Sequence, residues 1–368
     1  MKKRNRKRIP FIAAAVIGAA ALLAVILLGG AKLDRRMNSA AIAADTYEAR
    51  GNSGYIRGTV ALDGFHYNYY HNIENYLVIG VDNSVTDDGN HVGMADFLLL
   101  MSIDKTADTY SLLELNRDTI TEINTIAPDG TGVGTADLQL CTAHWYGGTP
   151  AIGCENQARA VSKLLGRLPI NGYYSIRMED IPKLNHAIGG VTITLEDDMT
   201  ASHPDMKKGA TVTLTDEMAE IYLRARMSTG SGTNEERMRR QHAYLEAFLT
   251  QGLEKTKTSP RYFYNVFEDM TDIAVTDLTG KQISRIAKAL TQNERTGIWK
   301  FEGESTTGQA LGDGIDHAEF YPDAASVVSV MTEILTLEKG AEVTQDEIDE
   351  EEMKEMEALM PADWEGAA

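Results

Sequence analysis

The sequence predicts an α/β fold with a central mixed β-sheet flanked by helices, preceded by one transmembrane helix at the N-terminus. Short, continuous apolar runs are typical of strands that are covered on both faces. Segments with helical periodicity follow these runs, which predicts alternating strands and helices. A third observation is an uncharged stretch of 20 residues near the N-terminus, long enough to cross a bilayer. The apolar runs are 76–81, 97–103 and 110–115, and the clearest helical segments that follow are 151–165 and 234–253.

The segments between and after these runs fit the same alternation. Residues 104–109 are polar and predict a tight connection between two strands. Gly189 and Gly190 end a helix predicted over 178–188, and Thr215 caps a helix that runs to about Arg224. We also expect strands over 173–176 and 191–195, and further helices and a strand within 259–336, with helical patterns at 285–290 and 325–335.

The uncharged stretch covers residues 11–30 and follows a basic N-terminus. The first eight residues carry six positive charges and no acid. A positive flank predicts a cytoplasmic N-terminus, which places the chain after about residue 35 outside the membrane. We therefore predict a single-pass cell-membrane protein with an extracellular C-terminal domain. A cleaved signal peptide is the alternative, and it leads to the same external location.

Composition divides the chain into six parts. They are a basic cytoplasmic tail (1–10), the transmembrane helix (11–30), a juxtamembrane linker (31–73), a domain that carries the site (74–255), a helical extension of the same body (256–337) and an acidic tail (338–368). Within the acidic tail, residues 338–357 hold ten acids and two lysines, so we expect a solvated, mobile or marginally helical extension. The whole chain has a net charge of −19, so the exported part carries about −25, which argues against nucleic acid as a partner.

Both cysteines, Cys141 and Cys154, lie in the exported part. Twelve residues separate them, and an oxidising compartment allows a disulfide that contributes about 3 kcal/mol. Two buried free thiols are the alternative. The cysteines and the eight histidines show no CxxC, HExxH or other metal-ligand spacing.

A cluster of arginines stands out in this acidic chain. Five of them fall within 17 positions, on both sides of a Ser/Thr/Gly-rich linker at 228–233: Arg224, Arg226, Arg237, Arg239 and Arg240. The planar fork of a guanidinium group matches phosphate or carboxylate, so the cluster predicts an anion site. The alternative is a solvated helix face with salt bridges to Glu235 and Glu236.

Helical spacing separates these arginines into two groups. Arg237, Arg240, Gln241 and Tyr244 share one helical face, whereas Arg239 points away and is expected to be a surface charge. Side chains two residues apart on a helix point about 200° away from each other. Arg224 and Arg226 can therefore reach one ligand together only if their helix ends near Leu223.

Two aspartates mark the ends of predicted strands. Asp82 follows the first apolar run and Asp96 begins the second, while Arg117 and Asp118 follow the third. Ligands of α/β sheets bind at strand ends, and two carboxylates near a diphosphate indicate a divalent cation of the Mg²⁺ type. Each residue also has an ordinary interpretation as a turn residue, a strand-edge charge or a local salt bridge.

Several motifs follow the basic tail and the apolar segment in a fixed order. They are VIGVD, ADFLLLMSID, LLELNRDT, HWYGG, AVSKLLG, IGGVTI and YLRARM followed by ERMRRQ. In this order they resemble the LytR-CpsA-Psr family, over roughly residues 74–252. The resemblance implies an α/β/α fold that houses a polyprenyl diphosphate. It also implies transfer of glycopolymers from undecaprenyl diphosphate onto peptidoglycan with Mg²⁺.

The resemblance also implies roles for individual positions. Asp82 and Asp96 match metal-linked aspartates, and Arg117 matches the arginine of an R-D motif; we expect these three to carry catalysis. The expected diphosphate-binding set is Arg224, Arg226, Arg237, Arg240 and Gln241. Two positions depart from the family pattern: Met94 stands where an arginine is common, and Gln139 where a lysine is common.

These observations lead to a first hypothesis and two alternatives. The first is a membrane-anchored glycopolymer transferase of phosphotransferase type in a Gram-positive-type envelope, with a polyprenyl diphosphate-linked glycopolymer and peptidoglycan as partners and Mg²⁺ as cofactor. The second is a non-catalytic, regulatory binder of polyprenyl phosphates or wall glycans, which Met94 and Gln139 favour. The third is a pyrophosphatase that acts on a lipid diphosphate.

Overall fold

The computed structural model describes residues 58–82, 92–127, 130–224, 234–270 and 272–359. These residues all belong to one compact unit. Its centre is a six-stranded sheet with the order β11-β8-β3-β4-β5-β12. The strands are β3 (Ile73–Val81), β4 (Ala95–Asp104), β5 (Thr109–Leu115), β8 (Tyr173–Arg177), β11 (Val275–Thr276) and β12 (Glu294–Lys300).

The sheet is mixed, as the sequence predicts. β4 lies between β3 and β5 and is antiparallel to both, while β8 runs parallel to β3 and β12 runs parallel to β5. The polar segment after Asp104 forms the tight turn between β4 and β5. β3, β5, β8 and β12 therefore all end at the same edge of the sheet.

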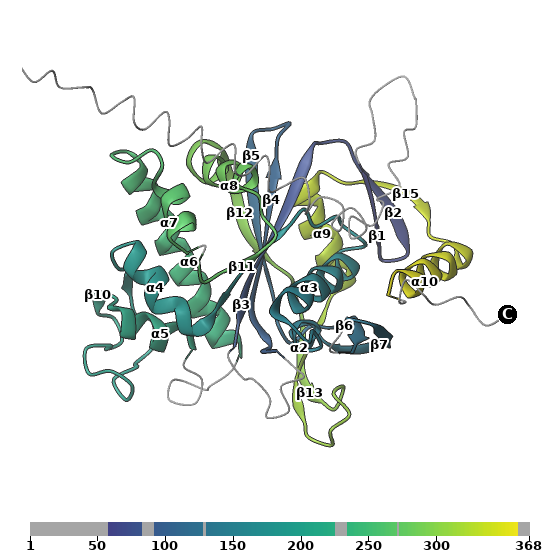
Figure 1. The fold of residues 1–368 in the computed structure, drawn as a ribbon, viewed down its shortest axis with the longest axis horizontal. Coiled ribbons are helices and arrows are strands. Elements are labelled where there is room, and N and C mark those ends of the chain that lie inside the picture. The colour runs from purple at the N-terminus through teal and green to yellow at the C-terminus, as the bar shows by residue number, and fades with distance from the viewer. Residues whose placement is uncertain (1–57, 83–91, 128–129, 225–233, 271, 360–368) are drawn as a thin grey trace, which may run out of the picture. The chain divides into compact units, whose positions relative to one another are not determined.

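Helices cover both faces of this sheet, so the continuous apolar runs are explained (Figure 1). Successive strand residues point to opposite faces: Leu77 and Ile79 pack in one core cluster, whereas Tyr76 belongs to another. The first face is covered by α3 (Pro150–Leu164) and α9 (Ala324–Leu335), and the second by α6 (Asn234–Thr256), α7 (Tyr262–Met270) and α8 (Gly280–Gln292). The predicted α/β architecture with covered sheet faces is confirmed.

The predicted helices near the site also form. The segment 178–188 begins as a 3-10 turn, Met178–Asp180, and continues as α4 (Ile181–Ala187). Gly189 and Gly190 end it with φ values of 74° and 83°, which glycine adopts without strain. α5 spans Asp216–Arg224, and its N-terminus is capped by the Thr215 hydroxyl, which accepts from the Met218 amide at 3.2 Å.

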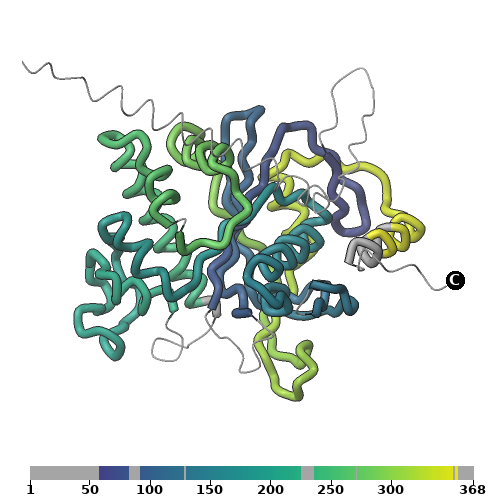
Figure 2. Tube along the Cα trace, in the orientation of Figure 1, coloured from purple at the N-terminus to yellow at the C-terminus, as the bar shows by residue number. Residues whose placement is uncertain are grey.

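The N- and C-terminal segments differ from the prediction. β1 (Gly58–Leu62) and β2 (Phe65–Tyr69) form a three-stranded sheet with β15 (Glu338–Glu342), and α10 (Gln345–Leu359) follows. Figure 2 shows this C-terminal strand beside the N-terminal ones. Val60 and Tyr67 are buried in the core, so the later part of the expected linker and the start of the expected acidic tail belong to the body.

Three further hairpins and one short helix complete the described chain. They are β6 (Ile120–Ile126) with β7 (Gly132–Gln139), β9 (Thr192–Thr194) with β10 (Thr211–Thr213), β13 (Gly303–Gly308) with β14 (His317–Pro322), and α2 (Thr142–Trp145). An isolated bridge between Thr119 and Phe320 joins β14 to the segment after β5.

Within the described ranges, no helix is long and apolar enough to cross a membrane. The predicted transmembrane helix at 11–30 lies outside those ranges.

Candidate functional site

The predicted aspartates and the first arginine meet at one edge of the central sheet. Asp82 follows β3, Asp96 is the second residue of β4, and Arg117 follows β5 by two residues. β3 and β5 run in the same direction, since each is antiparallel to β4. The carboxyl ends of these strands therefore lie together, at the edge where α/β sheets bind ligands.

An irregularity in the β3–β4 ladder sets the position of Asp96. Gly80 pairs with Phe97 and Val81 pairs with Ala95, so Asp96 is an extra residue between two paired ones. The Asp82 amide then donates to the Met94 carbonyl at 2.9 Å. Bulges of this kind occur next to active sites, where they turn a side chain away from the regular pleat.

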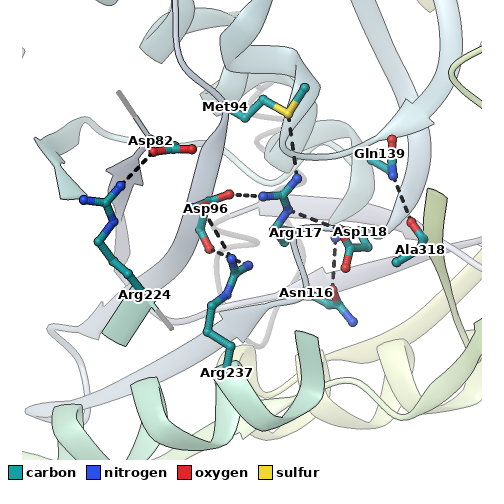
Figure 3. A network of polar contacts seen from close by, with 10 residues as sticks. All are labelled: Asp82, Met94, Asp96, Asn116, Arg117, Asp118, Gln139, Arg224, Arg237 and Ala318. Atoms are coloured by element: carbon teal, nitrogen blue, oxygen red, sulfur yellow. Dashed lines mark hydrogen bonds and ion pairs between the residues drawn. The ribbon is translucent and has the colours of Figure 1, made fainter. Parts of the chain in front are cut away.

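Asp96 is the centre of a largely buried ion cluster (Figure 3). One carboxylate oxygen pairs with the Arg117 guanidinium, and the other lies 3.3 Å from Nη1 of Arg237. Arg237 is 1% exposed and also donates to the Asp96 carbonyl at 3.4 Å. Arg117 pairs with Asp118 as well, at 3.1 Å. Charged groups with so little exposure are held in the protein by such partners.

Asp82 forms a second, exposed contact at the rim of the site. Nη2 of Arg224 lies 3.4 Å from its Oδ1, and the two side chains are 37% and 38% exposed. Arg224 also pairs with Glu220 one helical turn earlier, at 2.6 Å. Figure 3 shows this pair beside the Asp96 cluster. Arg224 is the last residue of α5, as required for it to reach a ligand, while Arg226 lies outside the described residues.

The remaining arginines of the cluster have other partners. Arg240 is buried; its Nε donates to the Tyr222 carbonyl at 2.9 Å, and its Nη1 lies 3.4 Å from Asp197. These contacts attach α6 to α5 and to the segment after β9, and the predicted diphosphate role of Arg240 has no support from them. Arg239 is exposed and pairs with Glu196 and Asp197, as expected for a surface charge.

Gln241 links this polar edge to a large apolar cavity. The cavity has a volume of about 200 Å³ and lies between the central sheet and the helices α4 to α8. Its walls are formed by aliphatic and aromatic residues such as Val78, Phe97, Leu245 and Phe263, and by Gln241. Gln241 also lines a small cavity that it shares with Asp96 and Arg117. Its Nε2 is buried without a hydrogen-bond partner, so a donor is available where the two cavities meet.

The model of the LytR-CpsA-Psr family matches residues 37–334, most of the chain. The chain belongs to the LytR-CpsA-Psr family. A relative from Bacillus mycoides, named polyisoprenyl-teichoic acid–peptidoglycan teichoic acid transferase TagU, is 27% identical over 176 residues, which are 48% of this chain and 51% of that protein. The chain thus spans about half the length of the curated relatives it matches.

Solved structures share the fold of this LytR-CpsA-Psr protein. The protein gbs0355 from Streptococcus agalactiae has a TM-score of 0.56 at 19% identity, over 76% of this chain and 94% of that one. TagT, a Bacillus subtilis protein solved bound to LI-WTA, has a TM-score of 0.52 at 16% identity, over 72% of this chain and 90% of that one. At these identities the similarity establishes the fold alone.

Of the two positions singled out in the sequence, Met94 adjoins the site and Gln139 faces β14. The Met94 sulfur lies 3.7 Å from Nη2 of Arg117. The Gln139 side chain is buried and donates to the Ala318 carbonyl at 2.9 Å, and its own Oε1 has no hydrogen-bond partner. Neither side chain carries a charge, and only Met94 contacts a residue of the ion cluster in this LytR-CpsA-Psr protein.

The disulfide prediction is wrong, because both cysteines are free and buried. The Cys154 sulfur lies 3.6 Å from Nε2 of His144, whereas Cys141 adjoins Arg117, whose carbonyl accepts from the Cys141 amide at 3.0 Å. Burial raises the pKa of Cys154 to about 12 and also raises the pKa of Cys141. Both thiols are therefore protonated at neutral pH and unsuited to nucleophilic catalysis.

Asp82 and Asp96 would hold a Mg²⁺ ion only together with a substrate, and only if Asp96 exchanged one of its arginine partners for the metal. Mg²⁺ commonly takes one or two carboxylates together with phosphate oxygens, and Asp82 and Asp96 supply carboxylates on neighbouring strands. Among the described residues, no group of three or more His, Cys, Asp or Glu side chains could hold a metal alone. Binding of the ion would therefore depend on phosphate oxygens from the ligand.

Sequence reasoning missed two polar residues beside the site, Glu114 and His242. Glu114 is buried in β5, and its Oε2 lies 3.1 Å from Nδ1 of His242 on α6. A signal was present, since Glu114 is the one charged residue in the apolar run 110–115. The partner on α6 could not be deduced from that signal.

Proposed function

We propose that this LytR-CpsA-Psr protein is a membrane-anchored transferase that moves a glycopolymer from a polyprenyl diphosphate carrier onto peptidoglycan. The observation that carries the proposal is the junction at Gln241, where an apolar cavity of about 200 Å³ meets the Arg117–Asp96–Arg237 cluster. A ligand that suits both parts has a long apolar chain joined to a strongly anionic group. A polyprenyl diphosphate has this chemistry.

The described residues divide the binding of such a carrier between them. The apolar chain would bury itself between the sheet and α6 to α8, at about 25 cal/mol per Å² of apolar surface. The diphosphate would accept hydrogen bonds from Arg117, Arg237 and the unpartnered Nε2 of Gln241. Arg224 at the exposed rim would contact the outer phosphate.

Transfer would then depend on charge stabilisation by these residues. An acceptor hydroxyl on peptidoglycan attacks the sugar-linked phosphorus, and the lipid-bearing phosphate departs with the bonding electrons. If the hydroxyl attacks the anomeric carbon instead, the whole lipid diphosphate departs with them. Arginine donors that are already fixed by Asp96 stabilise the charge that develops on it. Asp82 and Asp96 would hold Mg²⁺, which when bound neutralises negative charge on the diphosphate. Asp82 lies at the exposed rim, where the acceptor proton can leave to solvent.

The names of the relatives support the class of reaction. The curated relatives are teichoic acid transferases that act between a polyisoprenyl carrier and peptidoglycan, and TagT has been solved bound to LI-WTA. The predicted helix at 11–30 would anchor the body on the external side of a cell membrane.

Gln241→Leu gives a clean test. Because the Gln241 Nε2 has no partner, its removal leaves no group of the protein unpaired and stability should hold. We expect the full chain, with Mg²⁺, a short lipid-diphosphate-linked glycan and peptidoglycan fragments, to give a joined product by mass spectrometry. The variant should form this product at a rate about tenfold or more below that of the wild-type chain. Absence of product from the wild-type chain would contradict the proposal.

A non-catalytic lipid-phosphate binder is the second candidate. It is favoured by Met94 and Gln139, which leave the site two cations short of the family pattern. Tight binding of the lipid diphosphate without any joined product would support this candidate. Phosphate release without an acceptor would instead indicate a pyrophosphatase.

A further inference from the structure

Glu114 is a buried carboxylate near the end of β5, beside the proposed diphosphate site. It is 5% exposed and pairs in register with Leu99 on β4 and with Lys300 on β12. Its Oε2 is bound by His242, whereas its Oε1 is buried without a hydrogen-bond partner. An unpaired carboxylate oxygen in the interior is costly, so a donor that is not part of the chain is expected there.

The unpartnered oxygen belongs to a residue that lines the small cavity at the site. Glu114, Asp96, Arg117 and Gln241 all contribute to the wall of this cavity, whose volume is about 10 Å³. That volume is close to the space that one water molecule needs. The Gln241 Nε2 is likewise buried and unpartnered. One water can accept from this amide and donate to the Glu114 Oε1, which satisfies both groups.

His242 connects Glu114 to solvent. Its Nδ1 lies 3.1 Å from the Glu114 Oε2, and its side chain is 41% exposed. The hydrogen bond to Glu114 raises the pKa of His242, against the opposing effect of burial. The pair with Glu114 therefore shifts His242 toward the imidazolium form, whose charge offsets that of Glu114 next to an anion site.

Charged residues on the neighbouring elements surround the Glu114–His242 pair. Lys300 on β12 lowers the pKa of His242, and Glu246 on α6 raises it. Glu246 is itself paired with Arg295 of β12, at 2.9 Å. On the other side of the cavity, Asp96 is compensated by Arg117 and Arg237. Among these charged groups, Glu114 and His242 are therefore the carboxylate and the imidazole that can exchange a proton with a water in the small cavity.

We propose that Glu114 and His242 form a proton relay that delivers a proton, through one water in the small cavity, to the departing lipid-bearing phosphate. The proposal rests on the transferase function proposed above. Glu114 and His242 act through this water, so they position and supply the proton without contact with the substrate.

The acceptor oxygen forms the new bond, and the bond between the transferred group and the lipid-bearing phosphate oxygen breaks, leaving its electron pair on that oxygen. Nδ1 of His242 first passes its proton to the ionised Glu114. The Glu114 carboxyl group then turns and gives this proton to the cavity water while the water gives one of its own to the departing oxygen, so that Glu114 ends as a carboxylate again. His242 ends neutral and recovers its proton from solvent.

The pH dependence of transfer tests the relay. With the full chain, lipid-linked glycan and Mg²⁺, the wild-type rate should fall as pH rises through the pKa of His242, because the proton donor is lost. His242→Gln should remove this alkaline decrease and lower the neutral rate by about tenfold; Glu114→Gln, of equal shape, should do the same. His186→Gln, at an exposed histidine paired with Asp216, is the matched control and should leave the profile unchanged.

A binding measurement separates this proposal from the function on which it rests. In the histidine-labelled full chain, farnesyl diphosphate should raise the NMR-measured pKa of His242, and Glu114→Gln should weaken that response. Binding with wild-type rate and pH profile in Glu114→Gln and His242→Gln would overturn the relay alone. Failure of farnesyl diphosphate to bind would overturn the proposed function and the relay with it.

Discussion

The site contains two arginine–aspartate pairs that have the same chemistry and very different surroundings. Arg237 is only 1% exposed and the Asp96 side chain 12% exposed, whereas the side chains of Arg224 and Asp82 are each more than a third exposed. In the buried pair each group depends on its partner, because water is not available to solvate a lone charge. In the exposed pair, water and salt replace either partner at little cost. The buried half is therefore built in advance for an anion, while the exposed half can rearrange when a ligand arrives.

Removal of the buried arginine should have the largest effect. Arg237→Ala leaves Asp96 with less compensation in the interior, and we expect a loss of about 3–5 kcal/mol in the free energy of unfolding together with loss of transfer. Urea unfolding and the mass-spectrometric assay measure the two effects. Arg237→Met combined with Asp96→Asn should recover most of the stability but no transfer. If the double variant is as unstable as Arg237→Ala, the loss does not come from the uncompensated charge.

A buried histidine near the site makes the free energy of unfolding depend on pH. Nδ1 of His144 donates to the Gly93 carbonyl at 2.5 Å, beside Met94, and burial lowers the pKa of His144 to about 4. The unfolded chain binds the proton near pH 6.5, so this group destabilises the fold as pH falls from about 6.5 toward 4, by up to about 3 kcal/mol. Unfolding of His144→Gln should depend less on pH over this window. An equal dependence in both proteins would place its origin elsewhere.

The exposed pair should show a small effect on stability and a salt-sensitive effect on binding. Arg224→Ala should change the free energy of unfolding by less than about 1 kcal/mol. It should weaken farnesyl diphosphate binding several-fold at low salt and less at high salt, because the interaction is screened. Arg239→Ala is the matched control, since Arg239 is also exposed but pairs with Glu196 and Asp197. Equal effects of the two variants on binding would contradict a role for the rim.

The buried half of the site was largely predictable because it grows from the sheet. Continuous apolar runs marked β3, β4 and β5, and the polar residues at their ends then had to lie at one edge. The helical face shared by Arg237 and Gln241 was also predictable from spacing alone. Spacing could not predict the partners of Arg240, which lies three residues further along the same face and contacts the Tyr222 carbonyl and Asp197. That depends on how α5 and α6 pack.

Long-range pairing explains the other omissions. β15 has the sequence EKGAE and is exposed throughout, so its local pattern does not indicate a strand; it forms because β2 offers a free edge. Glu114 and His242 are separated by 128 positions, and only the packing of α6 on β5 brings them together. Local sequence carries no information on contacts of this kind.

Treatment of the two cysteines with a reductant should have the smallest effect on stability, because we expect no change at all. Both are buried free thiols, with Cys141 beside Arg117 and Cys154 beside His144. A disulfide between them would contribute about 3 kcal/mol, so its reduction would lower the melting temperature by several degrees. We expect the melting temperature to be the same with and without dithiothreitol, and two thiols per chain to react once the protein is unfolded. A reductant-dependent melting temperature would mean that the two sulfurs pair, and that the segment from Cys141 to Cys154, which adjoins Arg117, is held differently.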